Sequence, residues 1–510
     1  MNGERPGPQE GVAGAAGGPG PRRSRPAAAP AAADWGNPLL LLLFLFLLFV
    51  PGTFSAGPLQ LSLYKVFLLL ATIPLGVLWI RGAAGPVVAT DILILGFACW
   101  QVLSLFLHHG LTRIPYMGTN FVETFGAYLV GRVLVTSAAR FVAFFRYLLL
   151  CFMLLLPFAL VELLTGQRLW REIFGSVLTM GDNVRGERRM GLTRVYLGLP
   201  HPIHVGFVAS LAIANVYYIF AGRWLRRLGL TGIAGVMTFV GLSSAPMLGA
   251  LLQGVMIAWD RIVRVLRGHW VLFGLIGAVS LAVLQMALPG GIIGYLVNEV
   301  IFNPYGGANR IDIFNYGIAE VVRNPVFGIG LNEWRRPFWQ HATLDNFWLL
   351  ITMRYGIPGF LLLAGTIAVS GLSIASAKGL TPEEANYRTG YLIALASGIV
   401  VLGTVHIWES PVAFFMAYIG AGAWFYNRAG TAAAVAGPDA RNPGARRFTR
   451  APVTRGHPAA GQPAAMAVAP TPAPLPAATG AEAAEARRRA SREATLQRRA
   501  AGSAAGRPER

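Results

Sequence analysis

Charged residues are scarce in this chain of 510 residues: they make up 13 % of it, while hydrophobic residues make up 54 %. Lysine is almost missing, since Lys65 and Lys378 are the only two, and Cys99 and Cys151 are the only cysteines. So few charges exclude an ordinary soluble domain. Two cysteines inside apolar runs favour neither a disulfide framework nor a zinc site, and we expect both to pack as small hydrophobic side chains.

Several motifs of nucleotide and metal chemistry are also missing. The sequence has no GxxxxGK[ST] phosphate loop, no HExxH, no paired CxxC and no Asp-x-Asp pair, and the Gly-Ile-Gly at 328–330 lacks the third glycine of a dinucleotide fingerprint. These absences disfavour an ATP-driven pump and a metal-dependent enzyme that uses nucleotide sugars. We therefore expect neither a metal nor an organic cofactor.

What the sequence does have is long apolar runs. They approach the roughly 20 residues that an α-helix needs to cross a bilayer, and the alternating pattern of a membrane barrel is missing. The chain is therefore predicted to be an all-α polytopic membrane protein with about twelve transmembrane helices. The predicted spans cover residues 38–51, 59–80, 87–107, 121–138, 141–164, 201–221, 227–243, 245–260, 269–289, 346–376, 388–407 and 411–427.

The distribution of arginine tests this arrangement. If the N-terminus is cytoplasmic, every cytoplasmic connection is basic, as the positive-inside rule requires, and both termini lie in the cytoplasm. Two outside loops, at about 165–200 and 290–345, break the rule because they are long and rich in arginine. Long loops obey the rule weakly, but arginines kept on the outer side also favour a functional role.

The two ends of the chain differ in composition from this core. Residues 1–35 are rich in glycine, proline and alanine, and residues 429–510 are rich in alanine, proline and arginine. Such segments cannot bury a core, so both are predicted to be disordered cytoplasmic tails flanking a transmembrane domain at 36–428. The C-terminal arginines could touch anionic lipid headgroups or nucleic acid, but a solvated tail is the favoured interpretation, and no specific nucleic-acid partner is expected.

Arginine and aromatic residues are concentrated in the two outer loops. The planar guanidinium of arginine binds phosphate through two hydrogen bonds and keeps its charge, and tryptophan offers a flat face to a sugar ring. In the second loop, apolar residues at 311, 314, 318, 321 and 322 have helical spacing. An amphipathic helix is therefore predicted between the ninth and tenth spans, lying along the membrane surface. The combination suits an anionic lipid phosphate that carries a sugar.

Three stretches in order resemble the O-antigen ligase and polymerase family of bacterial envelope glycosyltransferases. RVYLGLPHPIHVGF at 194–207 is similar to the family's arginine, glycine and His-Pro before a span, and NRIDIFNYGIAEVVRNPVFGIGLNEW at 309–334 is similar to its large outer loop. LDNFWLLITMRYGIPGF at 344–360 keeps the family spacing at Asn346, Gly356 and Gly359, but Asp345 stands where the family has histidine. The resemblance covers about residues 180–427.

This resemblance implies an activity, a substrate and a location. The expected reaction is metal-independent, inverting transfer of an undecaprenyl-diphosphate-linked oligosaccharide to a hydroxyl of an acceptor glycan, on the periplasmic face of the bacterial inner membrane. Asp345 looks more like the exopolysaccharide polymerase side of the family, so polymerisation of exopolysaccharide or O-antigen repeats is expected, and ligation to lipid A–core is the alternative. Membrane lipid and, for a polymerase, a chain-length regulator are further expected partners.

Two functions of another class stay open. A secondary transporter of an amphiphile or glycan would share a broken helix and buried charges, although no repeat relates the two halves of the sequence. A membrane acyltransferase would use His406 with Glu409, but that histidine is more typical of a structural residue at the membrane interface.

The resemblance also assigns roles to individual residues. Asp345, or failing that His341, would take the proton from the acceptor hydroxyl, since a buried aspartate can act as a base. Arg310 would stabilise the diphosphate leaving group. Further residues expected to bind the substrate are Arg194, Arg189, Arg185, Asn346, Arg354, Trp334 and Trp348.

Arg354 raises a separate question, because it follows an apolar run. An arginine at membrane depth costs about 2.5–3.5 kcal/mol even on lenient scales. The sequence allows two forms of compensation: a wet cavity for a polar headgroup, or an ion pair with an acid such as Glu123 or Glu162.

Overall fold

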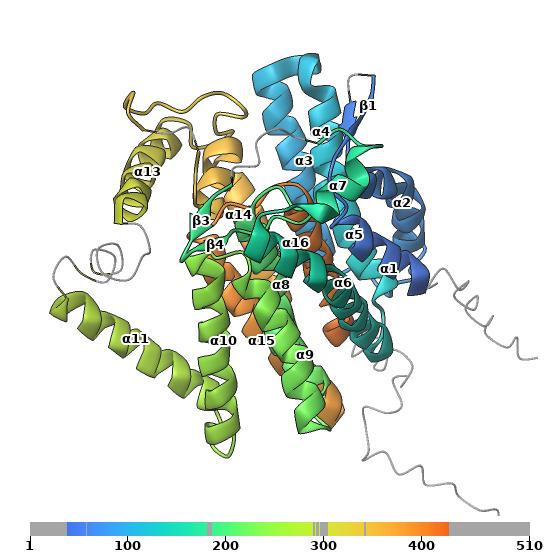
Figure 1. Cartoon of the computed structure of the whole chain (residues 1–510), viewed down its shortest axis with the longest axis vertical. Helices are drawn as coiled ribbons and strands as arrows, with labels where there is room; N and C mark the ends of the chain where they lie inside the picture. The colour runs from blue at the N-terminus through green and yellow to red at the C-terminus, as the bar shows by residue number, and fades with distance from the viewer. Residues whose placement is uncertain are drawn as a thin grey trace, which may run out of the picture. The chain divides into compact units, whose positions relative to one another are not determined.

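The computed structural model describes residues 38–57, 59–180, 186–288, 291, 295, 304–340 and 343–427. Helices make up most of this part of the chain (Figure 1). Six helical segments are long and apolar enough to cross a membrane, which confirms the predicted class of a mostly helical, membrane-embedded protein. They are α2 (Leu63–Ile80), the stretch Ala89–Leu134, α6 (Ala138–Thr165), α8 (Pro202–Ile219), α11 (His269–Ala287) and α14 (Phe347–Ala375).

The remaining helices fall on the other predicted spans and connections. The stretch Ala89–Leu134 bends back on itself, because α3 ends at Gly110, whose φ of 56° a glycine tolerates. A π-helical turn, Val122–Gly126, interrupts the returning half. The other elements are α1 (Pro38–Leu47), α3 (Ala89–His109), η1 (Gly110–Arg113), α4 (Ile114–Phe121), α5 (Ala127–Leu134), α7 (Leu169–Gly175), α9 (Trp224–Phe239), α10 (Ser244–Val263), α13 (Pro304–Arg323), α15 (Pro382–Leu402) and α16 (Ser410–Ala421).

Two small β-hairpins, which the sequence does not predict, lie in the connections. Strands β1 (Phe54–Ala56) and β2 (Leu59–Leu61) pair antiparallel, as do β3 (Arg188–Arg189) and β4 (Leu192–Thr193). Between β3 and β4 the chain turns at two residues of positive φ, Met190 and Gly191. A pair of residues with positive φ gives the tight turn that two-residue hairpins need.

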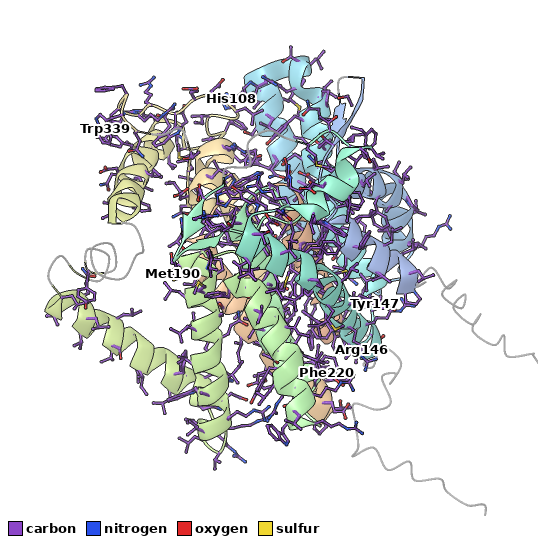
Figure 2. The ribbon with its side chains drawn as sticks, in the orientation of Figure 1. His108, Arg146, Tyr147, Met190, Phe220 and Trp339 are labelled. Carbon is purple, nitrogen blue, oxygen red and sulfur yellow. The ribbon has the colours of Figure 1, made fainter. Side chains whose placement is uncertain are left out.

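Connections that are far apart in the sequence contact one another. Thr53 forms a bridge with Thr179, which joins the connection between α1 and α2 to the loop after α7. The backbone N–H of Leu331 donates to Nε2 of His109 at 2.8 Å, which joins the loop after α13 to the α3–α4 hairpin. In Figure 2, His108 and Trp339 lie toward one end of the helices, and Arg146 and Phe220 lie toward the other.

Helices α5 and α16 approach closely through glycine. A β-carbon on Gly131 would collide with the carbonyl oxygen of Ala417, and one on Gly420 would collide with that of Tyr128. Small residues at such contacts let helix backbones touch inside a membrane, where the hydrophobic effect does not drive association. The contact holds the last helix against the returning half of the α3–α5 hairpin.

A buried ion pair joins α3 to α5. Arg132 donates from Nε to Asp91 at 2.9 Å, and both side chains are almost completely buried. Asp91 also accepts from Nε1 of Trp79 at 3.0 Å and from the hydroxyl of Tyr128. Arg132 donates in addition to the carbonyl oxygens of Ala84 and Pro86. The pair is thus fully hydrogen-bonded, which is the condition for a buried ion pair to be tolerated.

The predicted helix of the second outer loop is present, and a second face of it packs on the helix bundle. Helix α13 starts at Pro304 and packs on α14 through Ile313 and Val321. Four of the five apolar positions used for the prediction are exposed: Ile311, Phe314, Ile318 and Val322. The stripe read from the sequence is therefore the outer face of this helix, while its packed face also includes the buried Glu320.

Candidate functional site

A cavity of about 740 Å³ lies where six parts of the chain meet. These parts are α2, the α3–α4 hairpin with its π-helical turn, the start of α8, the loop after α13, the first half of α14, and the connection between α15 and α16 with the first turns of α16. Most of the side chains that line the cavity belong to connections predicted on the outer side, or to the helix turns next to them. The polar residues that line the cavity include Lys65, Asn120, Glu123, His201, Arg336, Asp345, Arg354, His406 and Glu409.

The cavity depends on a break in α14 at Gly356. This residue has φ 73° and ψ 179°, which ends the first half of the helix. The N–H of Ile357, which has lost its helical partner, donates to the carbonyl oxygen of Pro325 at 2.8 Å. A β-carbon at position 356 would collide with the carbonyl oxygen of Val326, so only glycine fits.

The loop at 325–330 also satisfies the carbonyl groups that the break exposes. The N–H of Ile329 donates to the oxygen of Met353 at 2.8 Å, and the N–H of Gly330 donates to the oxygen of Arg354 at 3.0 Å. Irregular backbone at membrane depth is tolerated where protein groups replace the missing hydrogen bonds. The Asn-Pro and Gly-Ile-Gly residues of the outer loop therefore stabilise the break in α14.

Helix α3 holds the same break from the other side. Nε1 of Trp100 donates to the carbonyl oxygen of Tyr355 at 2.7 Å, and its ring stacks on Phe327 with 5.1 Å between centroids. The hydroxyl of Ser104 donates to the carbonyl oxygen of Phe327 at 2.7 Å. One face of α3 thus fixes both the loop and the end of the first half of α14.

Arg354 stands at this break and lines the cavity. Among the described residues no carboxylate forms an ion pair with it. Glu123 is paired instead with Lys65 at 3.3 Å, and Glu162 with Arg168 at 3.6 Å. The expected alternative, a structural pair of Arg354 with Glu123 or Glu162, is therefore not formed, and the guanidinium faces the cavity.

Asp345 lines the same cavity as Arg354, just before α14 begins. No ion pair between described residues joins the two side chains. The helix cap is the neighbouring Asn346, whose Oδ1 accepts from the N–H of Leu349 at 3.0 Å. Trp348 lies on another side of the helix, where its Nε1 donates to the carbonyl oxygen of Ile399 at 3.2 Å. Asn346 and Trp348 are thus not among the lining residues.

Trp334 and Arg336 form part of the wall contributed by the loop after α13. The guanidinium of Arg336 lies 5.7 Å from the centre of the Trp334 ring and donates to the carbonyl oxygen of that residue. It also pairs with Glu333 at 3.2 Å. Both residues line the same cavity as Arg354.

The arginines of the first outer loop are placed differently. Arg194 pairs with Glu187 and donates from Nε to the carbonyl oxygen of Gly241 at 3.3 Å, while Arg189 donates to that of Leu242 at 3.0 Å. Burial alone would raise the pKa of Glu187, but the hydrogen bond and charge of Arg194 lower it below its usual value. Both arginines anchor their loop to the α9–α10 connection, and neither lines the cavity.

Three residues with predicted roles cannot be placed in the cavity. Arg185 and His341 lie outside the described residues. The backbone of Arg310 belongs to α13, but its side chain lies outside what the structure describes.

Histidines form a wall that the sequence does not predict. His201 and His406 line the cavity and flank Trp408, with ring centres 5.9 and 5.0 Å from it. Burial, and then the charge of Arg194, lower the pKa of His201 to about 4. The ring of His201 is therefore neutral at pH 7, and its Nδ1 accepts from the N–H of Ile203 at 3.2 Å.

A second charged group lines the cavity at Lys65, Glu123 and Glu409. Besides Lys65, Glu123 contacts Tyr64, whose hydroxyl donates to its Oε1 at 2.6 Å. Burial raises the pKa of Glu409, the charge of Lys65 opposes this effect, and the charge of Glu123 adds to it. One signal in the sequence could have pointed here, because Lys65 is one of only two lysines and lies inside an apolar run.

This arrangement combines a guanidinium that forms no ion pair with a described residue, carboxylates, imidazoles and an aromatic wall in one cavity. Among the described residues, no group of three or more histidine, cysteine, aspartate or glutamate side chains is placed to hold a metal ion. No protein-family model matches the chain, and no curated protein sequence matches it.

Proposed function

We propose that this protein is a membrane-embedded, inverting glycosyltransferase that takes a glycan from an undecaprenyl-diphosphate carrier and joins it to a sugar hydroxyl. The expected process is polymerisation of exopolysaccharide or O-antigen repeats. One observation carries the proposal: Arg354, which has no ion-pair partner among the described residues, and Asp345 line one cavity. A cation for a diphosphate and a carboxylate for a proton are the two groups that this reaction needs.

The reaction uses these two groups in a single displacement. The oxygen of the acceptor hydroxyl attacks the anomeric carbon, and the bond from that carbon to the diphosphate oxygen breaks on the opposite face. The hydroxyl proton passes to Asp345, and the electron pair leaves with the lipid diphosphate. Arg354, with Arg336 nearby, stabilises the negative charge on the leaving group. Because inversion needs one base only, the paired carboxylates of a glycosidase are not required.

The proposed arrangement in the membrane has twelve spans, with both termini in the cytoplasm. The cavity then opens at the periplasmic end of the helices, since its lining comes largely from connections on that side. Lipid-linked glycans reach that face of the inner membrane before they are joined. The cavity volume of about 740 Å³ falls in the range of small-molecule sites, which is enough for the diphosphate and the sugars next to it.

One alternative has a specific observation in its favour. A secondary transporter would also use a broken helix such as α14, with unwound backbone at its binding site. A transporter would move its substrate intact, whereas the proposed enzyme releases free undecaprenyl diphosphate. Detection of that product from purified protein in nanodiscs therefore separates the two functions.

The decisive experiment compares complementation of a deletion strain by wild type, Arg354→Ala and Asp345→Ala. Lipid-linked repeats and the length of the surface glycan are profiled in each strain. For a polymerase, deletion leaves single repeats on the carrier and neither variant restores long chains. Full-length polymer on the carrier would instead indicate a ligase. Unchanged carrier and glycan pools in the deletion strain would contradict the proposal.

A further inference from the structure

The group of Lys65, Glu123 and Glu409, which we name the glutamate end of the cavity, is not used by the proposed mechanism. Its members come from α2, the π-helical turn and the start of α16, so the fold brings together residues that are far apart in the sequence. It lies close to the arginine break, because Nδ2 of Asn120, on the same helix segment as Glu123, is 3.5 Å from the hydroxyl of Tyr355. Both ends therefore belong to one binding space.

The carboxylates of this end present oxygen atoms to the cavity. Oε1 of Glu123 is held by Tyr64 and Lys65, whereas its Oε2 has no hydrogen-bonding partner among the described residues. The carboxylate of Glu409 likewise has no hydrogen bond or ion pair with any described residue. Glu409 also has φ 56°, an uncommon conformation for a residue other than glycine. Free acceptors on a rigid frame are what a ligand with several hydroxyl groups requires.

The charges at this end decide which ligand fits. One lysine and two glutamates give it a net negative charge when all are ionised, so it repels the diphosphate that Arg354 attracts. A sugar without a negative charge suits it better, because sugar hydroxyls donate to carboxylate oxygens. Trp408, which precedes Glu409 and also lines the cavity, offers an aromatic face for the ring.

We propose that the glutamate end binds the acceptor sugar and selects acceptors that carry no negative charge next to the reacting hydroxyl. The proposal rests on the proposed function, in which the donor diphosphate occupies the Arg354 end. Glu123 and Glu409 accept hydrogen bonds from the acceptor, and Lys65 keeps Glu123 in place. An acidic sugar is excluded because its carboxylate would face two others with too little positive charge to offset the repulsion.

The test measures binding of three soluble sugars to the full chain in nanodiscs by saturation-transfer NMR. The probes are methyl glucoside, methyl glucosaminide and methyl glucuronide, which are neutral, basic and acidic. We expect the wild type to bind the first two at least about tenfold more tightly than the glucuronide. In the double variant Glu123→Gln, Glu409→Gln, the ratio of the dissociation constant of the glucuronide to those of the other two sugars should be close to one. Glu172→Gln, at an exposed glutamate of α7, should leave the ratio unchanged.

Three results would overturn the proposal: equal binding of glucuronide to the wild type, an unchanged ratio in the double variant, or no saturable binding of any of the three sugars. If the double variant does not fold, Glu409→Gln alone serves, since that carboxylate has no hydrogen-bonding or ion-pair partner among the described residues and its loss removes none of those contacts. Titration with undecaprenyl diphosphate tests the donor site at Arg354 independently of the acceptor site at the glutamate end. Failure of the wild type to bind it would end the donor assignment while leaving the sugar selectivity to be judged separately.

Discussion

Gly356 and Val326 are so close that a β-carbon on the glycine would collide with the carbonyl oxygen of the valine. The first residue breaks α14, and the second belongs to the outer loop that replaces the hydrogen bonds lost at the break. The position of Arg354, two residues earlier in the chain, follows from this contact.

Gly356→Ala should therefore damage both folding and activity. The left-handed φ of 73° adds strain of about 1–3 kcal/mol for a residue with a β-carbon, and the collision displaces the loop. We expect a lower thermal midpoint in nanodiscs and at least a tenfold loss of glycan polymerisation. Gly254→Ala on α10 is the matched control, because a β-carbon there meets open space. An active, stable Gly356→Ala protein would contradict this account of the break.

Trp100→Phe tests whether the Nε1 hydrogen bond of Trp100 positions Arg354, because the ring contact with Phe327 is kept. The substitution keeps a ring against Phe327 but removes the Nε1 donor to the carbonyl oxygen of Tyr355. A buried acceptor left without its donor costs about 1–3 kcal/mol, so we expect the turnover rate to fall by about 5- to 150-fold. The exposed Trp224 provides the control variant Trp224→Phe. Equal activity of both variants would show that α3 does not position the arginine.

Replacement of Arg354 should weaken binding of the donor, by an amount that depends on the charge and the shape of the new side chain. Arg354→Gln removes the charge, and we expect the dissociation constant for undecaprenyl diphosphate to rise at least tenfold. Arg354→Lys keeps the charge but loses the planar fork, so an intermediate value is expected. Titration of each variant in nanodiscs measures the effect, and Arg267→Gln, at an exposed arginine of the α10–α11 connection, is the control. Unchanged affinity in Arg354→Gln would remove this residue from the donor site.

Stability should fall as the pH drops from about 6.5 toward 4. The folded state lowers the pKa of His201 to about 4 from an ordinary value of 6.5. In this window the unfolded chain binds more protons than the folded one, so protonation favours unfolding. His201→Gln, which cannot titrate, should flatten part of this dependence in thermal unfolding scans from pH 7 to 4.5. A profile identical to that of the wild type would show that the surroundings of His201 do not keep it neutral.

Much of the fold could be predicted from the sequence, because apolar length and the distribution of arginine depend on local composition. Among the described residues a helix overlaps each predicted span, six helical segments are long and apolar enough to cross a membrane, and a helix is found in the second outer loop. Which of its residues pack on α14 was not predictable: apolar periodicity identifies a stripe, but Ile313 and Val321 make the contact.

The candidate site could be predicted only in part. Asp345 and Arg354 lie nine positions apart in one motif, and both line the cavity. The glutamate end could not be assembled from the sequence, since Lys65, Glu123 and Glu409 meet only through tertiary packing. The structure also places the cap of α14 at Asn346, next to Asp345. A difference of one residue in where a helix begins is beyond what local pattern resolves.

The loop at 325–330 is made before α14 during synthesis, yet it supplies the hydrogen bonds that shape α14. Insertion of the apolar segments into the bilayer and completion of the binding site are therefore separate events in the life of the protein. Until this loop has packed against α14, the position of Arg354 is not fixed and the cavity is incomplete.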